Sequence, residues 1–554
     1  MTHEVTNQSP PFQDVNLFTG DAVLRAAVER EGGGAAVADL TRFGAACGTA
    51  EAFECGRLAN EFPPRLKTHD AKGRRLDIVE FHPAYHACMA ASCAEGLHSG
   101  VWEHLAVPGT NPEPGANVAR AAACYMAAQM EAGHCCPITM TNAAVPTLLL
   151  QPDIAKVWLP KILPRAYDRR FRPAADKTAV TIGMGMTEKQ GGTDVRANTT
   201  RAEPAAGRGG PGAAYTVTGH KWFLSAPMCD AFLVLAQAPG GLSCFLMPRF
   251  RPDGSVNGLR LQRLKDKLGN RSNASSEVEF HSAHAWLIGE EGRGVPAIIE
   301  MVTYTRLDCA VASAGLMRLA LAQAIHHAQA RTVFGKPLAD QPLMTAVLAD
   351  MALDVEAATA LTFRLAWSFD HPNDPLAAAW RRLMTPVTKY WVCKVAPALV
   401  YEAMECLGGN GYVEEAGLAR IYREVPVNAI WEGSGNVMAL DVLRVLQREP
   451  EAVATVLDRL AQTAVEDGPV KAALARTRAF LGETHLLEGH GRALVESLAV
   501  IAAATILRTH APTAVADAFV AARLAGVPRH TYGAQAGSAA GKAILARAAP
   551  GAEQ

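Results

Sequence analysis

The spacing of apolar residues divides the chain into helical end regions and a strand-rich middle. In the first third, apolar residues recur at helical spacing, which predicts an all-α region. The expected helices span 21–31, 40–60, 83–105, 117–134 and 138–165. From Ala179 to about Glu290, apolar residues recur at every second position in short runs that glycine-rich turns separate. This pattern predicts a β-domain inserted between the helical regions.

Helical spacing returns after Gly294 in three long segments. They span 296–332, 340–370 and 376–407, and the last stops at Gly408-Gly409, which fits a glycine C-cap. With an apolar helix after Asn436, these segments predict a four-helix bundle. The predicted fold class is α+β, and 554 residues are too many for one ordinary core. We expect four parts: an N-terminal extension with an α-helical domain (1–178), an antiparallel β-barrel domain (179–290), the four-helix bundle (291–447) and an additional helical domain (448–554).

The net charge and the cysteines narrow the choice of partners and compartment. The formal net charge is −1, so binding to nucleic acid or membrane would need a local patch. The first twenty residues lack a basic segment followed by an apolar core, and no uninterrupted apolar run is long enough to cross a bilayer. Twelve cysteines are scattered without a CxxC pattern, which is typical of buried free thiols. We expect a reduced cytoplasmic protein without a membrane partner.

Two further features have a structural and a functional interpretation. Arg249 to Arg271 is distinctly basic, and a solvated strand face is the default explanation over a phosphate-binding patch. His82 and His86 lie four residues apart, but no HExxH pattern or third ligand accompanies them. Packing or hydrogen bonding is expected for both histidines, and no metal site is predicted.

The stretch around Glu432 is the first candidate for catalytic chemistry. This carboxylate stands between Trp431 and the glycines Gly433 and Gly435. An indole can exclude water, and desolvation raises a carboxyl pKa toward the range of a general base. Ser434 or Asn436 can cap the apolar helix that follows. By itself, the stretch is better explained as a helix start, where the helix dipole favours an acidic residue.

A glycine-rich loop at the start of the β-domain is the second candidate. Gly183 to Asp194 offers backbone N–H groups and the hydroxyls of Thr187 and Thr193, which can hydrogen-bond the polar edge of an isoalloxazine ring. Trp222 on the next hairpin can cover a ring face. A plain β-turn also explains the loop. Neither a GxGxxG motif after a strand nor a Walker A motif is present, so we expect no Rossmann or P-loop nucleotide site.

Five motifs in order resemble those of the acyl-CoA dehydrogenase family over roughly residues 40 to 447. They are Met186-Thr-Glu188 with Gly192-Thr-Asp194, Gly219-His-Lys-Trp222, Arg331-Thr-Val-Phe334-Gly-Lys-Pro-Leu338, Gly408-Gly-Asn-Gly-Tyr412 and Trp431-Glu-Gly-Ser434. The resemblance implies FAD bound between the β-domain and the bundle, with an acyl-CoA ester as substrate. Family members place the catalytic base at the position of Glu432 or near that of Thr305. Because Thr305 is no carboxylate, the resemblance implies Glu432.

The resemblance also implies which residues surround the cofactor. For the chain's own FAD these are Met184, Met186, Thr187, Gly192, Thr193, Trp222, Phe223, Leu224, Trp431, Gly433, Ser434 and Asn436. Arg331 and Phe334 would contribute to the FAD of a neighbouring subunit, so an oligomer is implied. Glu405 stands where many family members have a glutamine near the partner's FAD. A carboxylate there repels a dinucleotide phosphate, so the ADP end would be held differently.

A narrower resemblance covers the whole chain and indicates the AidB-like branch of this family, which is induced in the bacterial response to DNA alkylation. It is carried by the N-terminal segment, residues 75–86, Thr187 to Gly192, Lys265 to Asn273 and the tail. It implies a homotetramer (a dimer of dimers), weak isovaleryl-CoA dehydrogenase activity and binding of double-stranded DNA.

DNA binding of this kind requires clustered basic side chains that reach phosphates. The candidates are Arg444 and Arg448, one helical turn apart, followed by the stretch from Arg249 to Arg271. Two alternatives stay open. One is an ordinary short- or branched-chain acyl-CoA dehydrogenase without a DNA role. The other is a flavin-binding scaffold without a relevant reaction.

Overall fold

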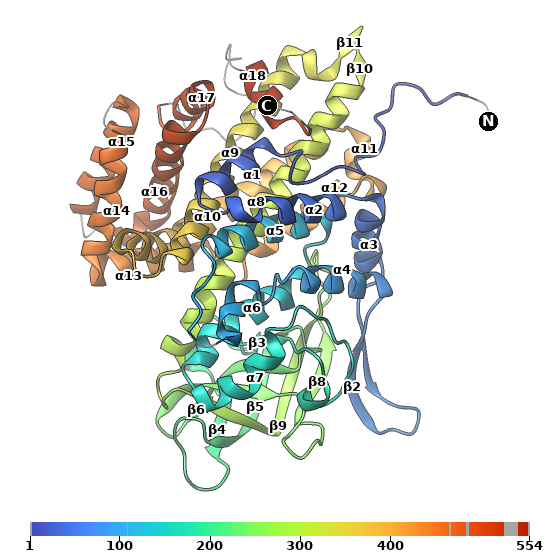
Figure 1. The fold of residues 1–554 in the computed structure, drawn as a ribbon, viewed down its shortest axis with the longest axis vertical. Coiled ribbons are helices and arrows are strands. Elements are labelled where there is room, and N and C mark those ends of the chain that lie inside the picture. The colour runs from blue at the N-terminus through green and yellow to red at the C-terminus, as the bar shows by residue number, and fades with distance from the viewer. Residues whose placement is uncertain (1–2, 108, 465–466, 483–486, 526–540, 552–554) are drawn as a thin grey trace. The chain divides into compact units, whose positions relative to one another are not determined.

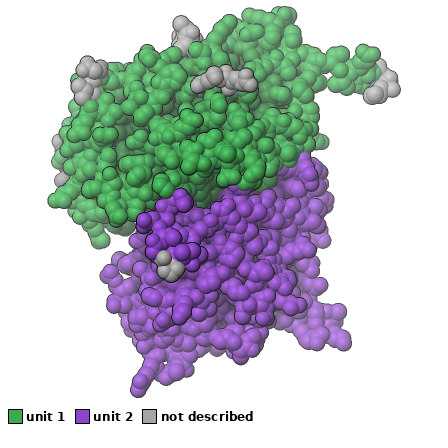
Figure 2. Space-filling model, in the orientation of Figure 1, with its two compact units in different colours: residues 1–50, 114–130, 306–554 green, residues 51–113, 131–305 purple. Residues whose placement is uncertain are grey.

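A computed structural model describes residues 3–107, 109–464, 467–482, 487–525 and 541–551. The chain forms two compact units, coloured separately in Figure 2. Unit 1 comprises Met1–Ala50, Pro114–Met130 and Arg306–Gln554, and unit 2 comprises Glu51–Glu113 and Glu131–Thr305. Each unit is therefore assembled from segments that are distant in the sequence. The division into four parts stays a prediction.

Unit 1 is built from helices (Figure 1). Three predicted long helices are confirmed as α8 (Gly294–Ala330), α9 (Pro342–Asp370) and α10 (Pro375–Cys406), and α8 contributes its residues from Arg306 onward. Both α9 and α10 begin with proline, whose fixed φ suits a first helical position. The other helices up to the tail are α1 (Ala22–Arg30), α2 (Val37–Cys47), α5 (Ala116–Met130), α11 (Gly409–Tyr412), α12 (Leu418–Glu424) and α13 (Gly435–Arg448).

The helical tail packs on the bundle through buried ion pairs. It comprises α14 (Pro450–Thr463), α15 (Gly468–Gly482), α16 (Leu487–His510), α17 (Thr513–Arg523) and α18 (Gly541–Ala548). Arg523 at the end of α17 contacts Asp350 and Asp354 of α9 at 2.8 and 3.0 Å. Arg547 in α18 contacts Glu356 of the same helix at 2.9 Å. The tail is therefore part of unit 1 and not a separate arm.

The sheet of unit 2 closes on itself, which confirms the predicted barrel. Its strand order is β3-β5-β4-β6-β7-β9-β8, and an additional β5–β9 pairing completes the ring. The strands are β3 (Ile182–Gly185), β4 (Arg201–Pro204), β5 (Ala214–Ser225), β6 (Ala231–Ala238), β7 (Gly241–Pro248), β8 (Leu259–Leu264) and β9 (Ser275–Ile288). The prediction of a purely antiparallel barrel is wrong in one respect, because β3 and β4 pair with β6 in parallel.

The prediction of an all-α first third is also wrong. Strands β1 (Arg65–His69) and β2 (Arg75–Glu80) form an antiparallel hairpin in unit 2. Asp70 closes the turn by accepting the backbone N–H groups of Lys72 and Arg74. Gly73 supplies the positive φ of 79° that the turn needs. Apart from the buried Asp77, the residues of both strands are exposed or half-buried, so their apolar period is weak.

Two predicted helices of the first third are divided in two. The segment 40–60 is split between α2 and α3 (Ala50–Glu61) at Gly48, where a side chain would collide with the Val15 carbonyl. The segment 138–165 is split between α6 (Cys135–Leu149) and α7 (Pro152–Ile162), because a proline starts the second helix. Helix α4 (Pro83–Ala94) is shorter than predicted and ends before Gly96, which has a φ of 77°.

Two of the described helices are long and apolar enough to cross a membrane by length and composition alone. They are Gly294–Ala330 and Glu488–His510, and 83% and 72% of their apolar windows are buried within the protein. Burial of that extent is what core helices of a folded domain show.

Candidate functional site

The predicted base lies on a turn of unit 1 that leads into α13. Glu432 has a φ of 58° and Gly433 a φ of 103°, so both occupy the left-handed region. For a glutamate this conformation is uncommon and costs about 1–3 kcal/mol, so surrounding contacts must hold it. The residue is half-buried, and its carboxylate oxygen Oε2 is covered by protein. The turn therefore presents a partly desolvated carboxylate.

Backbone carbonyls on this turn accept hydrogen bonds from buried cations. The Lys389 ammonium donates to the Trp431 and Gly433 carbonyls at 2.7 and 2.5 Å. The Arg306 Nε donates to the Glu432 carbonyl at 3.1 Å. The sequence prediction missed both residues, because they lie 42 and 126 positions from the carbonyls they bind.

The residues beside Glu432 differ in burial and in hydrogen bonding. Trp431 is half-buried beside it, and its indole N–H donates to the Asn428 side chain at 3.0 Å, which fixes the ring. Ser434 precedes α13 as the N-cap residue but makes no side-chain capping bond, and Asn436 lies exposed in the first turn. The prediction of a side-chain cap at the start of α13 is therefore wrong.

The candidate flavin loop, residues 183–194, lies in unit 2 and is fastened by a buried ion pair. The Lys221 ammonium lies 2.7 Å from the Glu188 carboxylate, and both side chains are completely buried. The backbone N–H of Trp222 donates to the Thr187 carbonyl at 2.8 Å, which joins the loop to strand β5 at this residue. Burial raises the pKa of Glu188, but the Lys221 charge and hydrogen bonds outweigh burial and lower it to about 2.

The predicted flavin-facing residues divide into exposed and buried ones. Gly192 and Thr193 are exposed, Met186, Thr187 and Trp222 are half-buried, and Phe223 is 44% exposed. Met184 and Leu224 lie in the core of the barrel, and Leu224 has no exposed surface. A register shift in β5 between Lys221 and Leu224 interrupts the regular alternation of faces, so that Leu224 is buried while Phe223 is exposed. Only the exposed and half-buried residues of this set can present a surface to a ligand.

The basic stretch from Arg249 to Arg271 serves internal contacts. Arg249 is buried and donates to the Asp77 and Leu259 carbonyls. Arg263 and Lys265 share the Glu277 carboxylate at 2.6 and 2.7 Å. The Lys265 ammonium also lies 3.3 Å from the centre of the Trp222 ring, a cation–π contact that the sequence prediction missed. This distribution favours the structural interpretation over a phosphate-binding patch.

Arg331 and Phe334 lie at a hairpin of unit 1, next to strands β10 (Thr332–Val333) and β11 (Lys336–Pro337). Phe334 is 99% exposed and has a φ of 50°. Arg331 donates to the Asn7 carbonyl at 2.6 Å, so the N-terminal segment supports the hairpin. An aromatic side chain with almost no cover in one chain fits the prediction that it contacts another subunit.

The two candidate DNA-binding arginines are exposed on α13. Arg444 lies 3.9 Å from Asp441, and Arg448 follows one turn later. Glu449 is also exposed and lies at the end of the helix, where it pairs with Arg382. The exposed surface at the end of α13 therefore carries both positive and negative side chains.

The remaining predictions concern histidines and cysteines. His82 accepts the Ala84 N–H at the start of α4, and His86 lies 2.8 Å from the Tyr167 hydroxyl. Both histidines thus have structural partners, and the described residues contain no group of three metal-ligating side chains. All twelve cysteines are free thiols, and ten of them are buried.

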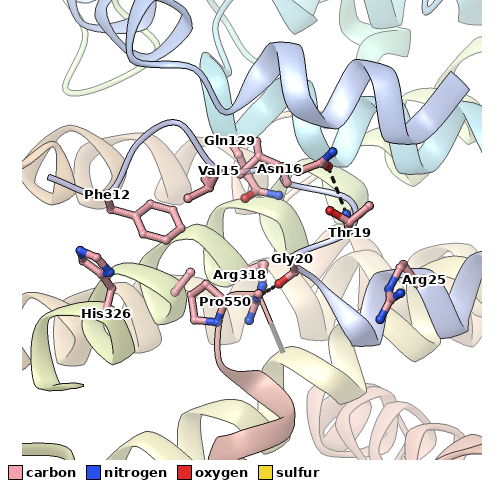
Figure 3. Close-up of a pocket in the computed structure, with 13 residues that line it drawn as sticks. Phe12, Val15, Asn16, Thr19, Gly20, Arg25, Gln129, Arg318, His326 and Pro550 are labelled. Atoms are coloured by element: carbon pink, nitrogen blue, oxygen red, sulfur yellow. Dashed lines mark hydrogen bonds between the residues drawn. The ribbon is translucent and has the colours of Figure 1, made fainter. Parts of the chain in front are cut away.

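A cavity of about 490 Å³ in unit 1 is lined by none of the predicted site residues (Figure 3). The N-terminal segment covers it with Phe12 and Asn16, and Arg318 of α8 lies on its wall. The Arg318 donors are already directed to Asp21 and to the Gly20 and Ala548 carbonyls. Arg318 is therefore already neutralised and hydrogen-bonded, so it carries no argument for a ligand in this cavity.

Comparison with known proteins matches three family models along the chain. Residues 7–169 match the Adaptive response protein AidB N-terminal domain. Residues 183–283 match the acyl-CoA dehydrogenase middle domain, and residues 292–447 match its C-terminal domain. These three segments agree with the order of motifs that the sequence presented.

Individual relatives agree with the family models. AidB of Escherichia coli (strain K12) is 52% identical over 466 residues, which cover 84% of this chain and 83% of the relative. Acyl-CoA dehydrogenase family member 11 of Caenorhabditis elegans is 31% identical over 532 residues, covering 92% of this chain and 84% of the relative. The chain belongs to the acyl-CoA dehydrogenase family, and its similarity to AidB identifies it as an AidB-like flavoprotein.

Solved structures confirm the fold. The Caenorhabditis elegans ACDH-11 protein in complex with C11-CoA superimposes with a TM-score of 0.84 at 29% identity, covering 96% of this chain and 95% of that one. A Bacillus anthracis acyl-CoA dehydrogenase complexed with FAD gives a TM-score of 0.61 at 19% identity, covering 84% and 79%. The cofactor predicted from the sequence, FAD, is the cofactor of this family.

Proposed function

We propose that this protein is an FAD-dependent acyl-CoA dehydrogenase in which Glu432 removes the α-proton of an acyl thioester. The observation that carries the proposal is the half-buried Glu432, held in a left-handed turn with one carboxylate oxygen covered. Partial desolvation favours the protonated form of a carboxyl group, so it makes the carboxylate a better proton acceptor. Among relatives of this fold, ACDH-11 was solved with a CoA thioester.

The described residues of unit 2 fit a flavin. The loop that the Glu188–Lys221 pair holds carries the hydroxyls of Thr187 and Thr193. Its Thr187 carbonyl accepts the backbone N–H of the half-buried Trp222. The isoalloxazine ring of a flavin needs an aromatic surface against its face and hydrogen-bonding groups at its polar edge. When bound, FAD supplies the acceptor for the β-hydride of the acyl chain. Thr187, Thr193 and Trp222 would orient it, and Glu432 would hold the α-proton.

Substitution of Glu432 by glutamine tests the assignment of the base. The change keeps the size of the side chain but removes its basicity, so FAD content should be unchanged. Anaerobic bleaching of the flavin by isovaleryl-CoA should fall by at least about 100-fold, the low end of a general-base contribution. Bleaching at the wild-type rate would show that Glu432 is not the base.

We also propose that the protein works as a homotetramer, a dimer of dimers, in the cytoplasm. The fully exposed Phe334 supports the oligomer, since its hairpin offers an aromatic group to a second copy. Free thiols on all twelve cysteines support a reducing compartment. The substrate preference that we propose is a short branched acyl chain with low turnover, as isovaleryl-CoA would provide.

A second candidate function is binding of double-stranded DNA in the response to alkylation. The exposure of Arg444 and Arg448, one turn apart on α13, favours it. Phosphate contacts release counterions, so affinity should fall steeply between about 50 and 200 mM salt. Replacing both arginines by alanine should weaken binding and flatten the salt dependence, measured by fluorescence anisotropy with a labelled duplex. A wild-type protein that does not bind the duplex at low salt would reject this function.

A further inference from the structure

We propose that Lys389 and Arg306 are positioning residues that hold the Glu432 carboxylate in place through its backbone. The proposal rests on the proposed function, because it assigns these two cations a role in the reaction of Glu432. Neither residue belonged to the predicted site, and neither needs to touch the substrate.

Lys389 closes the turn from the side of α10. Its side chain is only 1% exposed, and its ammonium donates to the carbonyls of the two residues that flank Glu432. A buried ammonium usually pairs with a carboxylate, because desolvation of an unpaired charge is costly. Among the described contacts of Lys389, both hydrogen bonds go instead to Trp431 and Gly433 carbonyls. This lysine therefore fixes the two peptide planes from which Glu432 projects.

Arg306 closes the turn from the side of α8. It is 7% exposed, and its Nε donates to the carbonyl of Glu432 itself at 3.1 Å. The other side of its guanidinium is fixed, since Nη1 lies 2.7 Å from the Asp441 carboxylate of α13. Hydrogen bonds with a charged donor are the stronger ones, and three successive carbonyls receive them here.

The conformation of the turn explains why such support is needed. Glu432 and Gly433 both have positive φ values, and a released turn would return Glu432 to the more populated right-handed or extended regions. A rotation of the backbone at Glu432 redirects the whole side chain. Misplacement of a catalytic group by about 1 Å can cost about 100-fold in rate. The two cations should therefore affect the rate of proton removal more than the affinity for substrate.

The test uses Lys389→Met and Arg306→Gln in the full-length protein reconstituted with FAD. Arg547→Gln is the matched control, because it removes a cation whose side chain is 11% exposed and pairs with Glu356, far from the turn in sequence. Stopped-flow bleaching by isovaleryl-CoA gives the limiting reduction rate and the substrate dependence. Hydrogen exchange of the peptide 427–436 reports the turn without any reaction.

We expect both variants to keep FAD and to lose about 10- to 100-fold in the limiting rate, with half-saturation changed by less than about threefold. Exchange of peptide 427–436 should accelerate in both, and Lys389→Arg should recover part of the loss. The control should retain the wild-type rate and exchange.

Each outcome separates this inference from the proposed function. If Glu432→Gln is inactive but Lys389→Met and Arg306→Gln react at the wild-type rate, the base assignment holds and the positioning role is wrong. Unchanged exchange of peptide 427–436 in both variants overturns the role as well, even if no acyl-CoA reduces the wild type. If Glu432→Gln bleaches normally, the proposed function itself fails.

Discussion

Loss of the Lys221 ammonium should loosen the candidate flavin loop. In Lys221→Met the aliphatic stem remains, but the completely buried Glu188 carboxylate loses the charge that lies 2.7 Å away. Removal of one partner from a buried ion pair costs about 3–5 kcal/mol, because the other charge stays buried without compensation. Hydrogen bonds from Thr199 and Thr200 to Glu188 remain, so we expect the lower end of that range.

Hydrogen exchange of the peptides that contain β3 and β5 measures this loss locally. A loss of about 3 kcal/mol corresponds to roughly 100-fold faster exchange through local opening. FAD content should fall in parallel, because the loop and Trp222 are joined at Thr187. The exposed Lys156 on α7 lies outside this loop, so Lys156→Met is the control and should change neither quantity.

The double variant Glu188→Gln/Lys221→Met decides whether the two charges act as a pair. Neutral partners carry no desolvated charge, so the double variant should be more stable than Lys221→Met alone. If the effects of the two single substitutions simply add, the two side chains are not coupled and the reasoning fails. Exchange in Lys221→Met at the wild-type rate would also refute it.

The pH dependence of the pair follows from the pKa of Glu188. Burial raises this pKa, but Lys221 and the hydrogen bonds lower it to about 2, below the ordinary value near 4.5. A lowered carboxyl pKa contributes stability that is present above the unfolded value and is lost as the pH falls through the folded value. Protection of β3 and β5 should therefore decline between about pH 4.5 and 2 in the wild type. In Glu188→Gln this part of the decline should be missing.

Three further outcomes are expected. Gly433 has a φ of 103°, and a methyl group on it would lie 2.8 Å from Met438 Cε. Gly433→Ala should therefore destabilise the turn that carries Glu432 and slow flavin reduction, measured by stopped-flow bleaching, at least about tenfold. Arg523→Met should remove the ion pair with Asp354 at 3.0 Å and accelerate exchange in α17, and unchanged exchange would contradict the docking role. Phe334→Asp should lower the oligomer mass in light scattering together with FAD content, whereas a full-size, FAD-loaded oligomer would place Phe334 outside any subunit contact.

Periodicity and motif order were sufficient to predict the order of helical and strand-rich regions in this protein. The long helices α8, α9 and α10 end within a few residues of the predicted limits, because apolar spacing and terminal proline or glycine are local signals. The same local signals are weak where a segment is largely exposed. The hairpin of β1 and β2 was missed for that reason, although the Asp70–Gly73 turn was readable.

The candidate site could be identified only from the sequence and the tertiary structure together. The sequence places Glu432 beside Trp431 and two glycines, and the family resemblance assigns Thr187 and Trp222 to one flavin site. It could not show that Leu224 is completely buried while its neighbour Phe223 is exposed, since strand register is set by the barrel.

Tertiary structure alone decided what holds these groups. Lys389 and Arg306 reach the turn that carries Glu432 from distant helices, and Lys265, directly after β8, reaches the face of Trp222 on β5. Nothing in the local sequence marks such residues, because a hydrogen bond or cation–π contact depends on distance in space. The sequence therefore determined which groups are available for chemistry, and folding decided which cations would hold them in place.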